Sequence, residues 1–465
     1  MTVLFDQLKS IVGAKGFSTD PAEIAPHLEE WRSKYSGASP LLLKPASTAE
    51  VSAIVTLCHQ SGTALVPQGG NTGLVGAQIP FHNEILLNLS RMNQIRTVDA
   101  QNSCLIAEAG VILATAQQRA DDENLLLAPS LASEGSATIG GLISSNAGGV
   151  NVLRYGMMRE QVLGLEVVLA DGCVLNLLRS LRKDNTGYDL KQLFIGAEGT
   201  LGIITAAVLK LFPKPSEHAT ALVAVADVRQ ATALLARLQS HTNGLLNAFE
   251  LIARAGLELV LRHISGSKDP FSATAPWYVL CEASGIKGVA EAFQAGLESA
   301  LEDGLAEDVV IASNDGQRVA LWRLRETLSE AQKLEGPSLK HDISIPVSAA
   351  ADFIDTAIAA VAAALPSARP VPFGHLGDGN LHFNFQMATG GDAQSYLAQW
   401  DAVQQIVHDI VHEFGGSFSA EHGVGVMKRG AIARYKTAAE IDLMRTLKNA
   451  LDPSATLNPG KLIPD

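Results

Sequence analysis

Three glycine-rich stretches in the first half of the chain constrain its fold more than any other feature. They are QGGNTGLVG at 68–76, PSLASEGSATIGGLISSNAGGVN at 129–151 and IGAEGTLGIIT at 195–205. The first directly follows the apolar, strand-like segment 64–67. Glycines placed after a strand let backbone N–H groups approach a phosphate without side chains in the way. One such loop is usually a plain turn, but three in one region favour a fold that binds a ligand through its loops.

These loops differ from the common nucleotide-binding motifs. No G-x-G-x-x-G lies between a strand and a helix with an acidic residue about 20 positions further on, and no G-x-x-x-x-G-K-[ST] is present. We therefore expect a large diphosphate-bearing cofactor that is held by extended loops rather than at a single helix N-terminus.

The order of elements predicts an α+β protein with a boundary near Lys214. Residues 1–38 read as a helical segment, 41–47 as a strand, 48–61 as a helix capped by Thr48, and 64–67 as a second strand. After Pro213 and Pro215 the composition changes, and strands at 221–228 and 278–282 alternate with long Ala/Leu/Glu-rich helices. From residue 431 onward the chain reads as helical again.

Length, charge and cysteine spacing narrow the functional classes. A chain of 465 residues is too long for one core and predicts two or more domains. Its net charge of −13 disfavours nucleic-acid and anionic-membrane partners. The N-terminus lacks the long apolar stretch of a secretory signal, and segment 353–365, interrupted by Asp355, reads as a packed helix rather than an integral membrane segment. Four widely spaced cysteines fit a reducing cytoplasm and supply no iron–sulfur ligand set, so we expect a cytoplasmic protein.

The segment GHLGDGNLH at 374–382 predicts a metal centre. Its two histidines flank a glycine-rich turn, and Glu421 and His422 follow downstream. His375, His382 and Glu421 form a three-residue ligand set that leaves coordination positions open for a substrate, as catalytic zinc sites do. The same ligand types also suit Mn²⁺ or Co²⁺. Alone, each histidine would more often be structural, but the turn between them and the Glu-His pair favour the metal.

Two further groups have a catalytic and a structural interpretation. His422 adjoins Glu421, so its side chain can act as a general base near neutral pH, or it can orient a metal ligand. Segment 317–334 reads as one helix on which Arg325 and Ser329 lie four residues apart on one flank, and Lys340 follows it. From the residues alone, a solvated helix flank followed by an unrelated lysine is the favoured interpretation of these three.

Motifs along most of the chain resemble a known flavoprotein family. PQGGNTGLVGAQIP, SEGSATIGGLISSNAGGVNVLRYG and GAEGTLGIIT are similar to the FAD-binding half of the vanillyl-alcohol-oxidase-type (PCMH) flavoproteins. FGHLGDGNLHFN, SAEHGVG and the closing LNPGK are similar to the FAD-dependent D-2-hydroxyacid dehydrogenases, closest to the D-2-hydroxyglutarate dehydrogenase group. The resemblance runs from about Leu41 to the C-terminus and implies a dehydrogenase of D-2-hydroxy acids.

The resemblance also implies a domain plan and a cofactor. Residues 1–38 would be an N-terminal helical segment, 39–214 the PCMH-type FAD-binding domain, 215–430 an α+β substrate and metal domain (the cap), and 431–465 a helical segment returning to the FAD domain. Asn71 stands where some relatives carry a flavin-linking histidine, so we expect non-covalent FAD. The first loop would contact the FAD diphosphate, the second would line the remaining cofactor, Ile203 would lie near the adenine and Asn458 near the ring. The loop residues implied are Pro67, Gly69, Gly70, Asn71, Thr72, Gly73 and Leu74, then Ser133, Gly135, Thr138, Gly140, Gly141, Asn146, Gly148 and Gly149.

For the substrate, the resemblance implies a dicarboxylate. Arg325, Ser329 and Lys340 would hold its distal carboxylate, although relatives can carry Thr in place of Ser329. Asn384 would contact substrate beside the metal, and His422 would be the base. We expect oxidation of D-2-hydroxyglutarate, with D-malate as a second substrate, an external acceptor such as an electron-transfer flavoprotein, and a homodimer. The alternatives are a D-lactate or glycolate dehydrogenase of the same superfamily, or a non-catalytic flavin-binding subunit of an oxidase complex.

Overall fold

The computed structural model describes residues 2–464 and divides the chain into two compact units. Unit 1 comprises Met1–Gly149, Gly156–Lys214 and Glu421–Asp465, and unit 2 comprises Val150–Tyr155 and Pro215–Ala420. The main change from unit 1 to unit 2 falls at Lys214, where the composition of the sequence changes. The chain re-enters unit 1 at Glu421, ten residues before the helical segment expected from 431, and a short excursion at 150–155 belongs to unit 2.

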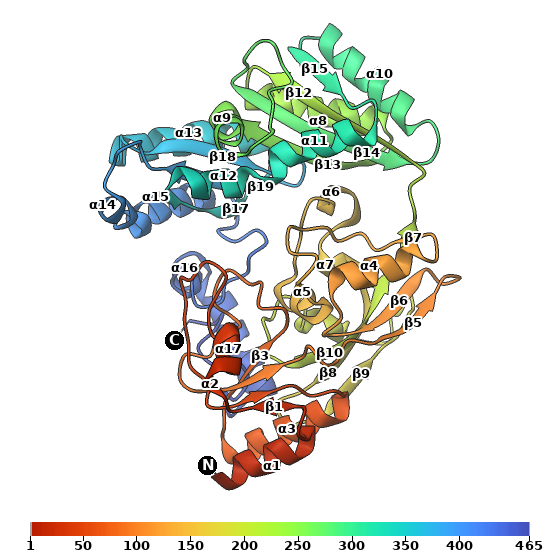
Figure 1. Cartoon of the computed structure of the whole chain (residues 1–465), viewed down its shortest axis with the longest axis vertical. Coiled ribbons are helices and arrows are strands. Elements are labelled where there is room, and N and C mark those ends of the chain that lie inside the picture. Colours follow the sequence, from red (N-terminus) through yellow and green to blue (C-terminus); the bar gives the residue numbers. More distant parts are fainter. Residues whose placement is uncertain (1, 465) are drawn as a thin grey trace. The chain divides into compact units, whose positions relative to one another are not determined.

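Unit 1 contains a mixed sheet, in which β1 pairs antiparallel with β2 and the other pairs are parallel, and a larger antiparallel sheet (Figure 1). The first sheet has the order β1-β2-β4-β3, the second β5-β6-β10-β8-β9, and β11 pairs with β7. The strands are β1 (Phe17–Ser18), β2 (Leu42–Leu43), β3 (Leu65–Gln68), β4 (Ile85–Asn88), β5 (Ile95–Asp99), β6 (Cys104–Glu108), β7 (Leu125–Leu126), β8 (Val162–Val168), β9 (Val174–Leu177), β10 (Ile203–Lys210) and β11 (Phe212–Pro213). The helices are α1 (Thr2–Val12), α2 (Pro21–Ile24), η1 (Ala25–His27), α3 (Thr48–Ser61), α4 (Leu113–Asp121), α5 (Ile139–Ser145), α7 (Met158–Gln161), η2 (Leu190–Leu193), α16 (Arg429–Tyr435) and α17 (Ala438–Leu451).

Helix α3 ends at the predicted residue but is capped one position earlier than expected. The side chain of Ser47, not Thr48, accepts the backbone N–H of Glu50, because Ser47 has the extended backbone that a capping residue needs. Gly62 ends the helix with φ +65°, a conformation that favours glycine.

The C-terminal segment extends the mixed sheet of unit 1 beside β3. Leu65 of β3 donates its N–H to the carbonyl of Thr456 at 2.8 Å, and the N–H of Asn458 donates to the carbonyl of Leu65 at 2.8 Å. Residues near the end of the chain therefore lie beside the strand that leads into the first glycine-rich loop.

Unit 2 is built on one antiparallel sheet of eight strands. Its order is β15-β12-β14-β13-β18-β19-β16, and β17 also pairs with β19. The strands are β12 (Glu217–Val225), β13 (Leu246–Ala253), β14 (Trp277–Gly285), β15 (Asp308–Ile311), β16 (Ser338–Leu339), β17 (Asp342–Ser344), β18 (Arg369–Gly374) and β19 (Asn380–Gln386). The helices are α6 (Val152–Tyr155), α8 (Val228–His241), α9 (Arg254–His263), α10 (Val289–Glu302), α11 (Asp315–Glu326), α12 (Leu328–Glu335), η3 (Val347–Ala349), α13 (Ala350–Ala364), α14 (Ala393–Leu397) and α15 (Trp400–Glu413).

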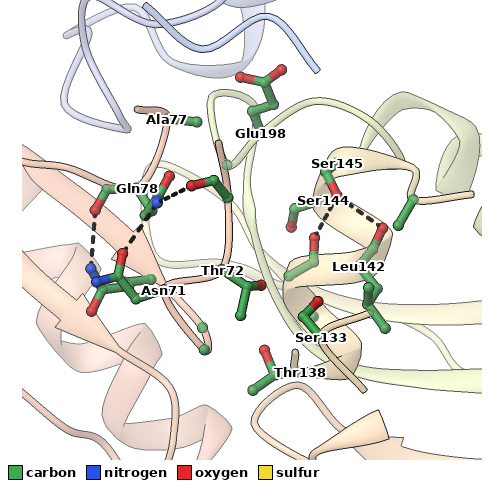
Figure 2. A pocket seen from close by; sticks show the side chains of 18 of the residues that line it. Asn71, Thr72, Ala77, Gln78, Ser133, Thr138, Leu142, Ser144, Ser145 and Glu198 are labelled. Atoms are coloured by element: carbon green, nitrogen blue, oxygen red, sulfur yellow. Dashed lines mark hydrogen bonds between the residues drawn. The ribbon is translucent and has the colours of Figure 1, made fainter. Parts of the chain in front are cut away.

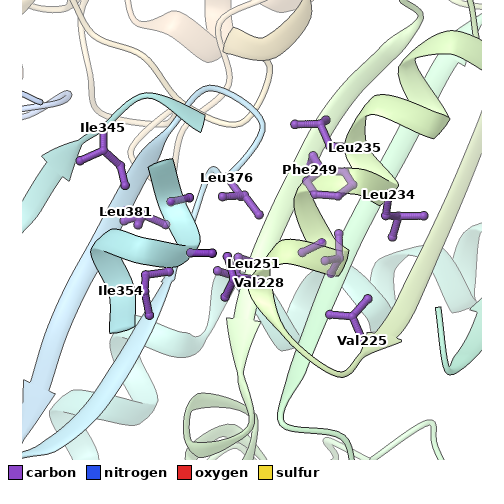
Figure 3. Close-up of a cluster of buried hydrophobic side chains, with 14 of the residues drawn as sticks. Val225, Val228, Leu234, Leu235, Phe249, Leu251, Ile345, Ile354, Leu376 and Leu381 are labelled. Atoms are coloured by element: carbon purple, nitrogen blue, oxygen red, sulfur yellow. The ribbon is translucent and has the colours of Figure 1, made fainter. Parts of the chain in front are cut away.

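Helices cover both faces of this sheet, which explains why its central strands are nearly continuous apolar runs. On one face Phe249 and Leu251 of β13 pack in a core with α8, α10, α13 and α15 (Figure 3). On the other face Ala248 and Ile252 of the same strand pack with α9, α11 and α12. Side chains alternate along a strand, so Glu250 belongs to the second face.

Helix α13 contains the apolar segment that the sequence analysis interprets as a packed helix. By length and composition alone, residues Val347–Ala364 could cross a membrane, as can the core helices of many folded domains. Phe353, Ile354, Ala357 and Val361 are buried in the core of unit 2, as a packed helix requires.

The predicted helix 317–334 is two helices. Helix α11 ends at Glu326, α12 starts at Leu328, and Thr327 between them has φ −87° and ψ 2°. The expectation of one continuous flank carrying Arg325 and Ser329 is therefore wrong. Arg325 is buried on α11, whereas Ser329 is exposed on α12.

Candidate active site

Unit 1 contains a cavity of about 540 Å³ formed largely by the three glycine-rich stretches. Figure 2 shows Thr72 of the first loop near Ser133 and Thr138 of the second, with Glu198 of the third in the upper part of the view. Glu421 and His422 also line the cavity. Loops distant in sequence are thus brought together around one space.

Most of the residues that the resemblance assigns to FAD line this cavity. They are Pro67, Gly69, Gly70, Asn71, Thr72, Gly73, Leu74, Ser133, Thr138, Gly140, Gly141, Gly148, Gly149, Ile203 and Asn458. Gly135 and Asn146 are not among the lining residues. Asn146 instead ends α5 with φ +50°, and its side-chain oxygen accepts the N–H of Arg159 at 2.9 Å.

The cavity has the features that a large polar cofactor requires. A Cβ on Gly70 would lie 1.9 Å from the carbonyl oxygen of Ser136, so only glycine lets the first two loops approach this closely. Within the described part of the chain, the buried Oγ1 of Thr138 and Oδ1 of Asn458 have no hydrogen-bond partner. Buried polar atoms without partners are costly, and both atoms belong to residues that line the cavity, so a bound ligand with polar groups fits here.

Residues outside the predicted set shape the cavity as well. The side-chain amide of Gln78 donates to Oδ1 of Asn71 at 3.1 Å and to the carbonyl of Gly73 at 2.8 Å, which fixes the first loop (Figure 2). Asn71 in turn donates to the carbonyl of Glu29 at 2.9 Å. The side chain of Asn71 therefore supports the loop itself.

Glu198 of the third loop holds the segment that follows His422. Its Oε1 accepts the N–H of Val424 at 2.6 Å, and its Oε2 accepts the N–H of Gly425 at 2.8 Å. Burial raises the pKa of Glu198, although these two donors and Lys428 act in the opposite direction. The sequence analysis missed this role, and the only local signal was an acidic residue inside the glycine-rich motif.

In unit 2, a β-hairpin brings the two predicted metal-ligating histidines together. Strands β18 and β19 pair with Phe373 opposite His382, and His375 follows the end of β18. The imidazole rings of His375 and His382 are 5.5 Å apart between centroids. The glycine-rich turn expected between the two histidines is confirmed. The third predicted ligand, Glu421, is the first residue of the last stretch of unit 1.

Glu250 connects the histidine hairpin to Arg325 inside unit 2. Its Oε1 lies 2.7 Å from Nδ1 of His375, and its Oε2 accepts Nε–H of Arg325 at 2.7 Å. Burial would raise the pKa of Glu250, but the charges and hydrogen bonds of His375 and Arg325 outweigh it and hold this pKa at about 2. Because Oε2 is paired with the guanidinium of Arg325, the carboxylate is ionised and can only accept, so Nδ1 of His375 is the donor in this contact. A lone acid in the apolar strand NAFELIA was the available signal, and the sequence analysis missed it.

The predicted substrate residues of unit 2 differ in environment. Arg325 is buried with its guanidinium 5.0 Å from the centroid of the Phe373 ring, Lys340 is half-buried and Ser329 is exposed. Asn384 is buried, and its amide accepts the N–H of His341 at 3.0 Å and donates to Gln332 at 3.0 Å. Asn384 therefore already has structural partners in unit 2.

Comparison with known proteins assigns both parts of the chain to flavoprotein families. Residues 39–178 match the FAD binding domain model, and residues 214–462 match the model for FAD linked oxidases, C-terminal domain. The structure of p-cresol methylhydroxylase with substrate bound shares the fold, with a TM-score of 0.78 at 16% identity over 100% of this chain and 97% of that one. The expected α+β, PCMH-type architecture is confirmed, and the matches define an FAD-dependent oxidoreductase.

Relatives of this chain place it more narrowly. It is 39% identical over 458 residues to the mitochondrial D-2-hydroxyglutarate dehydrogenase of Arabidopsis thaliana, covering 98% of this chain and 80% of the relative. It is 40% identical over 454 residues to the mitochondrial D-2-hydroxyglutarate dehydrogenase of Bos taurus, covering 96% and 81%. The chain belongs to the D-2-hydroxyglutarate dehydrogenase family of FAD-linked oxidases and is an FAD-dependent dehydrogenase.

The expectation of a cytoplasmic protein is contradicted by these relatives, which are named mitochondrial. The argument from the sequence considered only a secretory signal and the cysteine spacing. Mitochondrial transit peptides are amphipathic rather than long apolar segments, and free cysteines are common to every reducing compartment. Neither observation distinguishes a cytoplasmic from a mitochondrial protein.

Proposed function

We propose that the protein oxidises D-2-hydroxyglutarate to 2-oxoglutarate with FAD and a divalent cation. The names of its relatives support this substrate. The observation that carries the proposal is the buried cluster of unit 2. There Glu250 contacts both the imidazole of His375 and the guanidinium of Arg325 at 2.7 Å, and the Phe373 ring lies 5.0 Å from the His382 ring and from the Arg325 guanidinium. Imidazoles suited to a cation and a guanidinium suited to a carboxylate thus share their neighbours.

His375, His382 and Glu421 would hold the cation, and the loops of unit 1 would hold FAD. When bound, FAD supplies a two-electron acceptor at flavin N5, and the cation supplies a Lewis acid that lowers the pKa of a substrate hydroxyl. Imidazole and carboxylate ligands suit Zn²⁺, and also Mn²⁺ or Co²⁺.

His422 would take the hydroxyl proton of the substrate. It lines the cavity of unit 1, and Glu198 fixes the backbone that follows it, so its position is well defined. A general base must be held within hydrogen-bond reach of the proton that it removes, and rigid backbone supports meet that need.

Arg325, Ser329 and Lys340 would bind the distal carboxylate. With Nε of Arg325 committed to Glu250, the two terminal nitrogens of its guanidinium are the groups that would meet a carboxylate. Two carboxylates and a 2-hydroxyl are also present in D-malate, which we propose as a second substrate.

Asn384 would contact the substrate through its side-chain amide. The amide oxygen already accepts the N–H of His341 and the amide nitrogen already donates to Gln332, so the contact would use the remaining lone pair or N–H.

A D-lactate or glycolate dehydrogenase is the rival within the same superfamily. Those substrates lack a second carboxylate, so a buried arginine fits them less well. For the external electron acceptor we propose an electron-transfer flavoprotein. The resemblance is also the basis on which we propose a homodimer.

The decisive experiment is an anaerobic titration of the purified yellow protein. D-2-hydroxyglutarate, D-malate, D-lactate and glycolate are added in turn, before and after dialysis against a chelator, and flavin bleaching at about 450 nm is followed. We expect bleaching at the lowest concentration with D-2-hydroxyglutarate, loss of bleaching after chelation, and recovery with Zn²⁺, Mn²⁺ or Co²⁺. Bleaching by D-lactate alone, or bleaching that chelation leaves unchanged, would contradict the proposal.

A further inference from the structure

Glu250, on strand β13 of the sheet of unit 2, contacts His375 and Arg325. His375 is a proposed metal ligand, and Arg325 is a proposed substrate-binding residue. The side chain of Glu250 is 1% exposed, that of His375 is 8% exposed and that of Arg325 is 10% exposed. Burying a carboxylate is costly unless each oxygen is paired, and here one oxygen meets the imidazole and the other meets the guanidinium.

We propose that Glu250 is a positioning residue that sets the geometry of the cation site and of the carboxylate clamp together. This inference rests on the function proposed above. By accepting Nδ1–H of His375, Glu250 leaves Nε2 as the lone pair available to a cation. By accepting Nε–H of Arg325, it fixes the plane of the guanidinium and leaves its terminal nitrogens for the substrate.

The contacts around Arg325 connect the two sites in a closed path. The Arg325 guanidinium lies 5.0 Å from the Phe373 ring centroid, and the Phe373 ring lies 5.0 Å from that of His382. The path from His375 through Glu250, Arg325 and Phe373 thus returns to the second histidine of the hairpin. A displacement of Glu250 would therefore change both cation binding by the histidines and carboxylate binding by Arg325. A carboxylate with only a structural role would change neither.

Glu282 provides a matched control in the same sheet. It lies on β14, adjacent to β13, and its register partner is Ala248, two residues from Glu250, so both carboxylates face the layer of α9, α11 and α12. Glu282 is also buried, and it accepts hydrogen bonds from Arg318 at 2.7 Å and Trp322 at 2.8 Å. Neither partner belongs to the predicted site.

The test compares Glu250→Gln with Glu282→Gln in the full-length holoprotein. A glutamine at 250 keeps the volume but turns an N–H toward one of the two donors, so it cannot hold both His375 and Arg325. Zn²⁺ affinity is measured by competition with a chromophoric chelator, and KM is measured for D-2-hydroxyglutarate and D-lactate. We expect Glu250→Gln to weaken Zn²⁺ binding about 10- to 100-fold and to raise KM more for the diacid. Glu282→Gln should lower thermal stability without either change.

A conservative variant, Glu250→Asp, controls for misfolding of Glu250→Gln. Glu250→Asp keeps the charge with a shorter side chain, so we expect intermediate Zn²⁺ affinity and an intermediate KM ratio. The positioning role would be overturned if Glu250→Gln and Glu250→Asp both kept the wild-type Zn²⁺ affinity and KM ratio. It would also be overturned if Glu282→Gln lost as much Zn²⁺ affinity and changed the KM ratio as much as Glu250→Gln. If the wild-type protein itself neither retains Zn²⁺ nor bleaches with D-2-hydroxyglutarate, the proposed function fails instead, so the two failures are distinguishable.

Discussion

Oε2 of Glu198 accepts a hydrogen bond from the backbone N–H of Gly425 at 2.8 Å, between residues 227 positions apart in the chain. The other oxygen accepts the N–H of Val424 at 2.6 Å. One side chain of the third glycine-rich loop thereby fixes the backbone two and three residues after His422. The position of the proposed base therefore depends on Glu198 through the backbone of Val424 and Gly425.

Replacing Glu198 should separate turnover from cofactor binding. Glu198→Gln retains one acceptor oxygen but turns an amide N–H toward the second backbone donor, at a cost of about 1–3 kcal/mol for the unpaired group. We expect flavin reduction by D-2-hydroxyglutarate to slow roughly ten-fold or more, because about 1.4 kcal/mol corresponds to ten-fold. FAD content, measured from the absorbance of the purified protein, should stay within a factor of two of wild type. A variant that loses its FAD but reduces the remaining flavin at the normal rate would show that Glu198 supports the cofactor instead.

Lys340 gives the cleanest test of the distal carboxylate clamp. Replacing Arg325 would leave Oε2 of the buried Glu250 without its partner and so combine a stability loss with any binding effect. Lys340 is half-buried, and Lys340→Met should raise KM for D-2-hydroxyglutarate roughly five- to twenty-fold, as loss of one charged hydrogen bond of about 1–2 kcal/mol predicts. KM for D-lactate should change less than two-fold. Lys333→Met, at an exposed position of α12, is the control, and equal KM changes for both acids would refute the clamp.

The close approach of the first two loops predicts opposite outcomes for two glycines. In Gly70→Ala the new Cβ would meet the carbonyl oxygen of Ser136 at 1.9 Å, so the loops must separate. For Gly135, no described heavy atom outside its chain neighbours lies within 4 Å of a Cβ. We expect Gly70→Ala to be purified largely without FAD and Gly135→Ala to be as yellow as wild type. Loss of FAD from Gly135→Ala would instead support the contact that the resemblance implies for this residue.

Acid stability should depend on Glu335 at the end of α12. Its hydrogen bond to His263 and its contacts with Arg369 and Arg262 outweigh partial burial and hold its pKa at about 2. A carboxyl whose pKa is lower when folded stabilises the protein above its unfolded pKa of about 4.3, and this contribution is lost as the pH falls toward 2. We expect Glu335→Gln to lower the free energy of unfolding at pH 7 by about 1–2 kcal/mol. This is less than the full pKa shift would imply, because solvent screens the partly exposed arginine partners.

The measurement is the melting temperature of wild type and Glu335→Gln between pH 7 and pH 2. The difference between the two should be constant down to about pH 4.5 and should shrink below it, because wild type alone loses this contribution. Glu302→Gln, at an exposed position of α10, should follow wild type. A difference that grows as the pH falls would contradict the assigned pKa direction.

Local features of this protein could be predicted from its sequence because they depend on neighbouring residues. The glycine-rich loops after strands, helix α3 and the GHLGDGNLH hairpin all follow from backbone preferences and short-range spacing. Strand β19 also alternates polar and apolar residues, which places His382 and Asn384 on the face opposite Phe383.

Other features were decided only by tertiary structure. Thr327 divides the segment predicted as one helix, and Arg325 is buried beside Glu250 although the residues alone favoured a solvated flank. The contacts of Glu250 join residues 75 and 125 positions apart, and those of Glu198 join residues 226 and 227 positions apart. Hydrophobic periodicity reports which face of an element is buried but not which element covers it, so the partners of a buried carboxylate emerge only when the sheets and helices pack.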